Sequence, residues 1–312
     1  MIETRPLGGT GLRPTIVGLG TSALGSMPDV HGYSVSDEQA SAALEDALCG
    51  PFTFVDTGAN YGDGRSESRL SAALERTQMR GRVIVATKVD RDSRGRFDGA
   101  QVVRSARESL ERLGMTSVPL LHLHDPEHIS FEDAMAPGGA VDAMVRLKED
   151  GIAEAIGVAG GPVSLMLRYI ETGVFDVVQT HNRYTLLDRT AEPLIARATE
   201  LGVGVINAAP YGGGILSDAP RGTRRYAYAD ASAETLSAAA RMRQAATAAG
   251  LPLAAAALQF STRDSRIAIT VVGMSAPGRA RATAQLLETT IPDELWRELE
   301  TLTPEPRAWL ND

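Results

Sequence analysis

The sequence contains very little cysteine and no long apolar run, which argues against a disulfide-bonded protein and against a membrane-spanning one. The only cysteine among 312 residues is Cys49, so no disulfide can form within the chain. Cys49 follows an alanine-rich helical pattern, and we expect a buried thiol there. No apolar segment approaches the ~20 residues that cross a membrane as a helix. The first residues, MIETRPLGGTG, lack the apolar core of a signal peptide, so we expect a cytoplasmic protein with no membrane partner.

Positive charge is also scarce. The chain has 31 lysines and arginines against 39 aspartates and glutamates, a formal net charge of -8. An acidic chain gives no electrostatic reason to expect a nucleic-acid partner. The one short basic cluster is RGTRR at residues 221–225, which we interpret as a solvated loop. The hydrophobic share of 43% and the charged share of 22% are typical of a globular protein with a large core.

Short apolar runs recur along the chain, and each is nearly continuous rather than alternating with polar residues. Such runs are typical of parallel strands that are covered on both faces. A helical pattern follows each run. We expect strands at residues 15–20, 52–57, 82–89, 118–124, 153–159, 175–180, 203–209 and 267–273, and helices at residues 36–48, 66–77, 100–113, 141–149, 163–171, 191–201, 233–249 and 277–287.

Eight strands and eight helices in strict alternation predict a closed (β/α)8 barrel, with residues 1–312 as a single domain. An open doubly wound sheet is the alternative, but no GxGxxG sequence follows the first strand. Residues 1–14 contain GGTG and suit a hairpin, and residues 292–303 predict an extra C-terminal helix. The connection from Tyr211 to Ser232 is unusually long, which is typical of a functional loop.

Polar side chains occur at the ends of three consecutive predicted strands. Asp56 ends the second strand and Tyr61 lies in the loop after it, while Lys88 and His124 end the third and fourth strands. Catalytic groups of such barrels lie at the carboxyl ends of the strands. We therefore expect these four residues, the tetrad, to share one site. His122 would lie deeper on the same strand face, and we interpret it as a core histidine with satisfied hydrogen bonds.

The tetrad suits proton transfer to and from an oxygen atom. A phenol has a pKa of about 10 in water, and a nearby ammonium such as that of Lys88 lowers this value. Asp56 would pair with Lys88, while His124 would orient the substrate oxygen. Tyr61 would then give a proton to a carbonyl or take one from an alcohol. Such a site needs a hydride carrier, so we expect NAD or NADP, and we expect no metal site.

Several segments resemble the aldo-keto reductase superfamily, in order and over essentially the whole chain. They are RPLGGTGL, VDTGANYGDGRSESRL, VATKV, LHLHDPE and VVGMSAP. HDPE, VINAAPY and LPLAAAALQF are also similar to the branch that contains D-threo-aldose 1-dehydrogenases and pyridoxal 4-dehydrogenase. The resemblance implies a barrel that binds NAD(P)(H) at the strand ends and interconverts a sugar hydroxyl, or a similar alcohol, and a carbonyl. It implies that Tyr61 is the general acid and base of the tetrad.

The resemblance also implies a set of cofactor contacts. Gln179 would contact the nicotinamide, and the last unit would hold the adenosine phosphate. Arg279 lies where many members grip the 2′-phosphate of NADP, and Gly273 lies where some members have a lysine, so the one basic group slightly favours NADP over NAD. The complete set of expected contacts is Gly20, Thr21, Ser22, Gln179, Tyr211, Gly273, Ser275 and Arg279.

Two positions depart from the pattern of the family. Ala159 and Gly160 replace a Ser-Asn pair that holds the carboxamide, and Ala208 replaces a tyrosine that stacks on the nicotinamide. Two other functions are therefore kept as alternatives: a non-catalytic nucleotide-binding barrel, and a Schiff-base lyase that uses Lys88. The sequence indicates a small carbonyl or sugar substrate, but neither its identity nor the oligomeric state.

Overall fold

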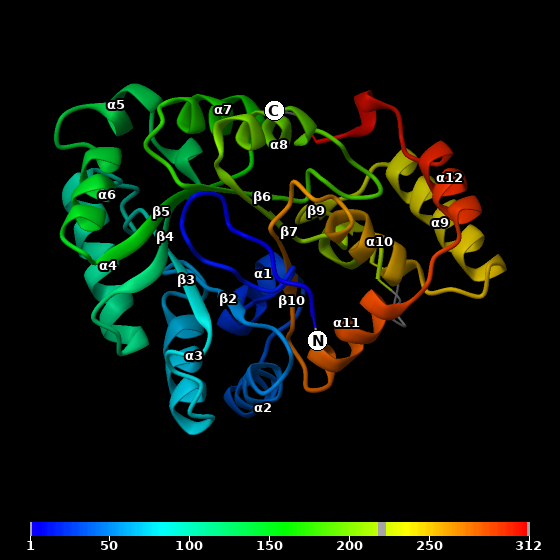
Figure 1. Cartoon of the computed structure of the whole chain (residues 1–312), viewed down its shortest axis with the longest axis horizontal. Coiled ribbons are helices and arrows are strands. Elements are labelled where there is room, and N and C mark those ends of the chain that lie inside the picture. The colour runs from blue at the N-terminus through cyan, green and yellow to red at the C-terminus, as the bar shows by residue number, and fades with distance from the viewer. Residues whose placement is uncertain (1, 218–222, 311–312) are drawn as a thin grey trace.

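The chain forms a closed barrel of parallel strands (Figure 1). The structure is a computed structural model that describes residues 2–217 and 223–310. The first strand pairs with both the second and the last strand of the ring, so the sheet has no open edge. The predicted barrel is therefore confirmed, and the doubly wound alternative is wrong.

Each barrel strand overlaps a predicted apolar run, and most are shorter than the run by one to three residues. Only β6 extends beyond its run, by one residue, to His181. The strands are β1 Val17–Gly20, β2 Phe54–Asp56, β3 Ile84–Val89, β4 Val118–His124, β5 Ala153–Ala159, β6 Val177–His181, β7 Gly204–Ala208 and β10 Ile269–Gly273.

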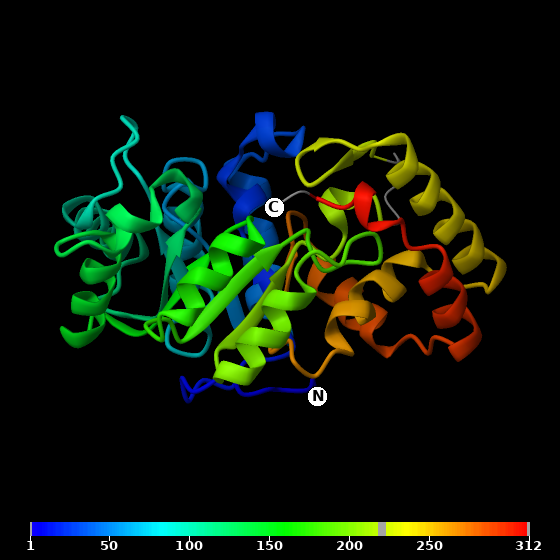
Figure 2. The ribbon, with the colours of Figure 1, turned by 90° about the horizontal axis from the view of Figure 1, so that it is seen from above.

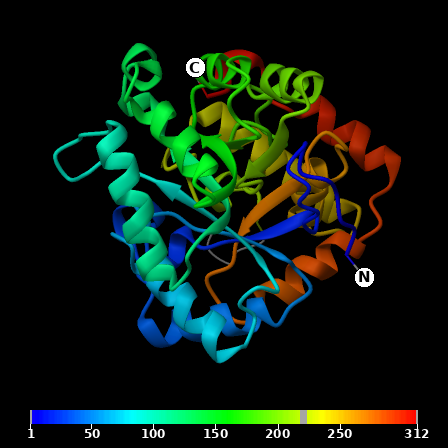
Figure 3. The same cartoon turned by 60° about the vertical axis from the view of Figure 1, so that its left-hand side comes forward.

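Helices surround the ring of strands (Figure 3). The predicted helices, including the extra one at the C-terminal end, are present: α2 Asp37–Leu48, α3 Arg65–Arg76, α4 Gly99–Leu113, α6 Ala140–Glu149, α7 Val163–Glu171, α8 Glu192–Leu201, α9 Ala233–Ala248, α11 Arg279–Glu288 and α12 Asp293–Thr301. Within the described ranges, none of the helices combines the length and apolarity needed to cross a bilayer.

Three helices were not predicted: α1 Pro28–His31, α5 Phe131–Met135 and α10 Leu253–Thr262. The alternation is therefore not strict, because α9 and α10 both lie between β7 and β10. Most of α10 is buried, and it packs against α9, α11 and β10. A helix that is covered on nearly every side has no polar face, so its sequence lacks the periodicity by which helices are recognised.

Both ends of α2 follow the prediction, whereas the residue directly after the helix does not. The Ser36 hydroxyl accepts a hydrogen bond from the backbone N–H of Gln39 at 3.2 Å, which caps the helix. The buried face of α2 ends with Ala47 and Leu48. Cys49 comes one residue later and turns toward solvent, so its thiol is exposed, and the expectation of a buried thiol is wrong.

The N-terminal segment closes the base of the barrel. The N–H groups of Arg5 and Leu7 donate to the carbonyls of Pro14 and Leu12 at 3.1 and 3.0 Å, which confirms a hairpin-like turn. Leu7 is fully buried among the side chains that fill the barrel. Gly8 has φ +54°, and a Cβ there would lie 2.4 Å from a backbone nitrogen of β7. Figure 2 shows this segment on the opposite side from α1.

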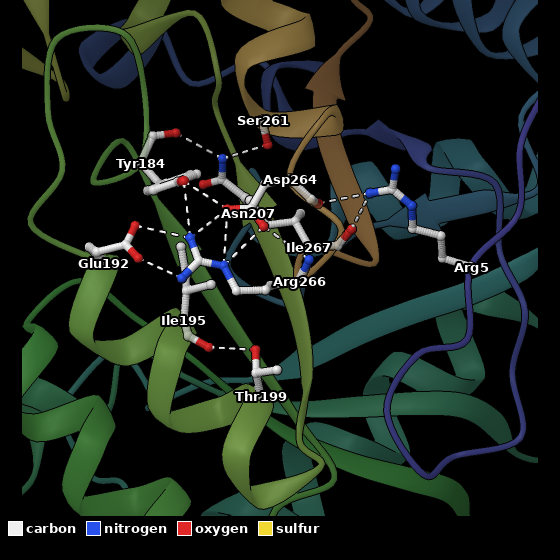
Figure 4. A network of polar contacts seen from close by, with 10 residues as sticks. All are labelled: Arg5, Tyr184, Glu192, Ile195, Thr199, Asn207, Ser261, Asp264, Arg266 and Ile267. Carbon is white, nitrogen blue, oxygen red and sulfur yellow. Dashed lines mark hydrogen bonds and ion pairs between the residues drawn. The ribbon is translucent and has the colours of Figure 1, made fainter. Parts of the chain in front are cut away.

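A polar network holds the turn before β10 against its neighbours (Figure 4). Arg266 donates to Asp264 at 2.7 Å and to Glu192 of α8 at 3.1 Å. Tyr184 donates to the same Asp264 carboxylate at 2.7 Å. Arg5 reaches the carbonyl of Asp264 at 2.8 Å, so the N-terminal segment, α8 and the turn before β10 are tied together.

The long connection after β7 lies partly outside the described residues, as does the basic cluster at residues 221–225. Its described end forms the hairpin β8 Arg225–Tyr226 and β9 Ala229–Asp230. Arg225 donates to the carbonyl of Val30 in α1 at 3.1 Å. Tyr226 donates to the carbonyl of Asn182 at 2.6 Å. The hairpin therefore bridges the loops after β1 and β6 at the mouth of the barrel (Figure 2).

His122 lies deep in the barrel, as predicted, but its hydrogen bonds are not satisfied. It is fully buried, and neither ring nitrogen has a partner among residues 2–217 and 223–310. Burial, together with the charges of Lys88 and His124, lowers the pKa of His122 well below its usual value. The ring packs against Gly157 of β5, where a Cβ would lie 2.4 Å from Nδ1.

We expect Gly157→Ala to destabilise the protein by roughly 1–3 kcal/mol, because the added methyl overpacks the barrel interior. The matched control is Gly9→Ala, since a Cβ at Gly9 would meet nothing within 4 Å. Its effect should stay within about 0.5 kcal/mol. Urea unfolding measures both changes, and equal stability of the two variants would contradict this packing.

Candidate active site

The register of the strands brings three members of the tetrad to one end of the barrel. Asp56 lies beside Gly20 and Ala86, and Lys88 lies beside His122. His124 is one pleat further along β4 than His122. Because alternate side chains share a face, Asp56, Lys88 and His124 all project into the carboxyl end of the barrel.

Lys88 is held by two oxygen acceptors in the interior. Its ammonium donates to Asp56 Oδ1 at 2.7 Å and to the carbonyl of Thr57 at 2.6 Å. Lys88 is 1% exposed and Asp56 is 3% exposed, so each charge depends on its partner for compensation. The predicted pairing of Asp56 with Lys88 is confirmed.

Tyr61 lies against both Lys88 and His124 of the tetrad. The Lys88 Nζ is 4.6 Å from the centroid of the Tyr61 ring. The rings of Tyr61 and His124 meet edge to face, with centroids 5.7 Å apart. The loop is fixed to β3, because the N–H of Ala59 donates to the carbonyl of Lys88 at 3.2 Å. The structure therefore brings all four predicted side chains into one cluster.

The pKa of Tyr61 is shifted in the direction opposite to the sequence-based expectation. Burial raises it well above the usual value of 10, and the charges of Asp56, Asp125 and Asp90 add to the effect. The Lys88 charge does not reverse this shift, since Asp56 already compensates it at 2.7 Å. The phenol of this site is consequently protonated at neutral pH.

His124 is held by a carboxylate that the sequence analysis did not single out. Its Nδ1 lies 2.9 and 3.0 Å from the two oxygens of Asp90, which directly follows β3. Burial lowers the pKa of His124, but the carboxylates of Asp90 and Asp125 outweigh it, so the pKa lies above the usual 6.5. The two carboxylates therefore favour the charged ring more than water does.

Sharp turns follow three of the strands that line the mouth. Asp125, Asn182 and Ala209 come directly after β4, β6 and β7 and have φ values of 43°, 58° and 58°. Left-handed backbone is uncommon for residues other than glycine and often marks functional sites. These turns begin the loops around the mouth directly at the ends of the strands.

The nicotinamide end of the expected cofactor site contains unsatisfied polar atoms. Gln179 of β6 is 5% exposed, and its Oε1 has no hydrogen-bond partner within the described ranges. The Oδ1 atom of Asn182 is also buried and unpaired there. Buried acceptors without partners are costly, and the N–H groups of a carboxamide would satisfy them. These residues therefore fit a nicotinamide, despite Ala159 beside Gln179 in the register.

The expected adenosine end lies at the start of α11. Gly273 and Arg279 are exposed there, and a Cβ at Gly273 would meet nothing within 4 Å. The Ser275 hydroxyl is 3.1 Å from the hydroxyl of Tyr33. The Asp46 carboxylate of α2 accepts a hydrogen bond from Gly278 N at 2.8 Å. An acid thus lies where the sequence predicts a phosphate.

The other predicted contacts are engaged with protein groups. The buried Thr21 hydroxyl donates to the carbonyl of Asp56 at 3.0 Å and accepts from Ser66 at 2.8 Å. The Ser22 hydroxyl is 3.1 Å from Nε2 of His31. Tyr211 packs between two hydrophobic clusters, next to the turn Gly212–Gly214. Their contacts with a cofactor stay a prediction.

Sequence reasoning missed several polar residues at the mouth. Asp90 follows a predicted strand that ends in Lys88-Val89, so its place at the strand end was a usable signal. His181 and Tyr228 lie with ring centroids 5.9 Å apart, and nothing in their sequence spacing indicates this contact. The same holds for Asp46, whose partner is 232 residues away.

Comparisons with known proteins agree with this geometry. Residues 16–303 match the aldo/keto reductase family. The chain is 33% identical over 307 residues to L-galactose dehydrogenase of Arabidopsis thaliana, covering 97% of this chain and 92% of the relative. It is 29% identical over 327 residues to D-threo-aldose 1-dehydrogenase of a Pseudomonas species, covering 96% and 97%. A solved aldo-keto reductase of Bacillus halodurans has the same fold, with a TM-score of 0.79 at 23% identity over 98% of this chain and 97% of that one.

We expect Asp56→Ala to lower the free energy of unfolding by about 3 kcal/mol or more, because it leaves the buried Lys88 ammonium without its carboxylate. The double variant Asp56→Ala with Lys88→Met should recover most of this loss, since neither charge of the pair remains. Urea unfolding of both variants tests the ion pair. A double variant as unstable as the single one would contradict it.

Proposed function

The chain belongs to the aldo/keto reductase family, and on that premise we propose that it interconverts a sugar hydroxyl and a carbonyl with Tyr61 as general acid and base. Members of the family are NAD(P)(H)-dependent oxidoreductases that act on carbonyl and alcohol substrates. Two relatives are named as sugar dehydrogenases, which supports a sugar or a similar polar alcohol as the substrate class. The observation that carries the proposal is the packing of Tyr61 against Lys88 and His124 at the barrel mouth.

In reduction, Tyr61 gives its proton to the carbonyl oxygen as that oxygen gains negative charge. The raised pKa keeps the phenol protonated at neutral pH, so the resting site is in the form that this direction needs. Lys88, with its Nζ 4.6 Å from the ring centroid, stabilises the phenolate that remains. In oxidation, the phenolate takes the proton of the hydroxyl. The nicotinamide, when bound, donates or accepts the hydride.

The remaining tetrad members hold this arrangement. Asp56 keeps the Lys88 ammonium in place, and His124 would orient the substrate oxygen. Tyr61, His124 and the mouth loops would orient the reacting carbon and exclude water from it. The buried oxygen of Gln179, which has no partner among the described residues, would hold the carboxamide of the nicotinamide.

The Schiff-base alternative is weakened by the state of Lys88. A lysine that attacks a carbonyl must present an uncharged, accessible amine. Here the ammonium is 1% exposed and donates to Asp56 and Thr57 at 2.7 and 2.6 Å. These two bonds and the burial of the side chain leave little access for an incoming carbonyl. The non-catalytic alternative keeps the cofactor site but predicts no turnover.

We expect Tyr61→Phe to bind NADPH and NADH with nearly unchanged affinity and to lose at least ~100-fold in kcat, because only the proton donor is removed. Cofactor affinity is measured by calorimetry, and turnover is measured with L-galactose, L-fucose and simple aldehydes in both directions. A variant that keeps normal turnover would disprove the role of Tyr61. A wild-type protein that binds cofactor but turns over none of these substrates would favour the non-catalytic barrel.

The preference between the two dinucleotides would depend on two opposite charges near α11. Arg279 begins this helix and favours the 2′-phosphate of NADP, as the sequence predicts. Asp46 accepts from the N-cap residue Gly278 at 2.8 Å and places a negative charge at the same helix terminus. A carboxylate near a phosphate is repulsive, so Asp46 opposes the NADP preference suggested by Arg279.

We expect Asp46→Asn to raise the affinity for NADP(H) relative to NAD(H) by roughly fivefold, since it removes about one like-charge contact at the surface. Arg279→Ala should change the ratio in the opposite direction. Calorimetric titration with all four dinucleotides measures this ratio without any substrate. An unchanged ratio in both variants would place the 2′-phosphate elsewhere.

A further inference from the structure

Asp90 makes contacts that no member of the tetrad makes. It is 6% exposed, and both carboxylate oxygens lie within 3.0 Å of Nδ1 of His124. The Oδ2 atom also accepts a hydrogen bond from the N–H of Asn60 at 3.0 Å. Asn60 directly precedes Tyr61. One buried carboxylate therefore connects the histidine of β4 to the loop that carries the tyrosine.

The backbone of Asp90 is itself fixed by α4. Its N–H donates to the hydroxyl of Ser105 at 3.1 Å, and its carbonyl accepts from Nε2 of Gln101 at 3.0 Å. Both helix residues are buried. The carboxylate is thus held in place before any ligand arrives, which is the condition under which a supporting group can orient a catalytic one.

The chemistry of the contact determines which nitrogen of His124 carries a hydrogen. A carboxylate only accepts hydrogen bonds, so Nδ1 must be the N–H of the neutral ring. The Nε2 atom is then a bare acceptor, and it becomes an N–H donor only when the ring is charged. Nε2 lies 3.7 Å from Asp125 Oδ1, beyond hydrogen-bond distance. It is the ring nitrogen left for a substrate oxygen.

We propose that Asp90 is a positioning residue that keeps the hydrogen of neutral His124 on Nδ1, so that Nε2 donates to the substrate oxygen only while the imidazole is charged. This inference rests on the proposed function, in which Tyr61 supplies the proton and His124 contributes a hydrogen bond. A neutral ring would offer its lone pair to the substrate and compete with Tyr61 for the hydrogen of an alcohol.

Other groups around His124 also act on its charge. Asp90 and Asp125 favour the charged ring, and Lys88 opposes it. The titratable groups that face the ring from the packed elements are Tyr61, Lys88, Asp90, His122, Asp125, Glu127 and His181. Of these groups, Asp90 is the one within hydrogen-bond distance of a ring nitrogen, so it alone would select the tautomer.

The variant Asp90→Asn keeps the size of the side chain and changes only the tautomer of His124 that it favours. The amide oxygen can keep the bond from the N–H of Asn60, because that position requires an acceptor. The amide nitrogen then takes the other position, 2.9 Å from Nδ1 of His124 in the wild-type geometry, and donates to it. In the variant, Nδ1 becomes an acceptor and the neutral ring carries its hydrogen on Nε2.

The first test uses ¹⁵N NMR of the imidazole rings in the cofactor-free protein, where a nitrogen with hydrogen and a bare nitrogen have distinct shifts. The chain has 5 histidines, and His124→Gln identifies the signals of His124. We expect Nδ1–H in the neutral wild-type ring and Nε2–H in Asp90→Asn. An Nε2–H tautomer in the wild type overturns the proposal, even when the variant does not fold.

The second test is the pH dependence of kcat/KM for carbonyl reduction. The wild type should lose activity as pH rises through the pKa of His124, which lies above 6.5. Asp90→Asn should be slower on the acid side, on the order of tenfold, because a neutral donor is weaker than a charged one. It should not show the loss at higher pH, so the two profiles converge or cross. A uniform decrease at every pH would mean a structural role only.

Asp125→Asn is the matched control. It removes a carboxylate near the same ring without removing the bond to Nδ1. The loss of kcat/KM with rising pH should therefore remain but occur at lower pH, because Asp125 raises the pKa of His124. The NMR shifts should keep the wild-type tautomer. A correct tautomer in a protein without turnover would refute the proposed function alone, whereas turnover with the wrong tautomer would refute only the role of Asp90.

Discussion

The ion pair between Lys88 and Asp56 is the constraint on which the site depends. Two charges taken out of water destabilise a protein unless each finds a well-placed partner. Here the partner lies at 2.7 Å, and the carbonyl of Thr57 satisfies a second ammonium hydrogen. Such geometry is available because β2 and β3 are adjacent parallel strands in fixed register. A shift of either strand by one residue would turn the side chain to the opposite face.

Lys88 and His124 at the mouth are held by separate carboxylates, one at the end of β2 and one just beyond β3. Asp56 at the end of β2 pairs with Lys88, and Asp90 just beyond β3 pairs with His124. Tyr61 lies between these pairs, with its ring in contact with both Lys88 and His124. Its phenol therefore has charged neighbours of both signs, and burial decides the resting state in favour of the protonated form.

The sequence predicted most of the barrel and the tetrad because both follow from local signals. Buried parallel strands leave apolar runs, and polar residues at the ends of those runs indicate a mouth. The features that it could not supply depend on packing. The helix α10 has no polar face, His122 has no hydrogen-bond partner in the part of the chain that the structure describes, and Cys49 lies one residue beyond the buried face of α2. The pKa of Tyr61 was predicted in the wrong direction, since proximity to Lys88 does not reveal that Asp56 compensates its charge.

The hairpin-like N-terminal segment closes one end of the barrel, so the interior opens only at the carboxyl end of the strands. Leu7 seats among the interior side chains, and Gly8 abuts the backbone at the start of β7 so closely that no methyl group fits between them. A ligand consequently approaches the tetrad from the carboxyl end of the barrel, at the rim where β8 contacts α1. Ligands then enter and leave through the same opening, so the order of binding and release depends on the loops of that one rim.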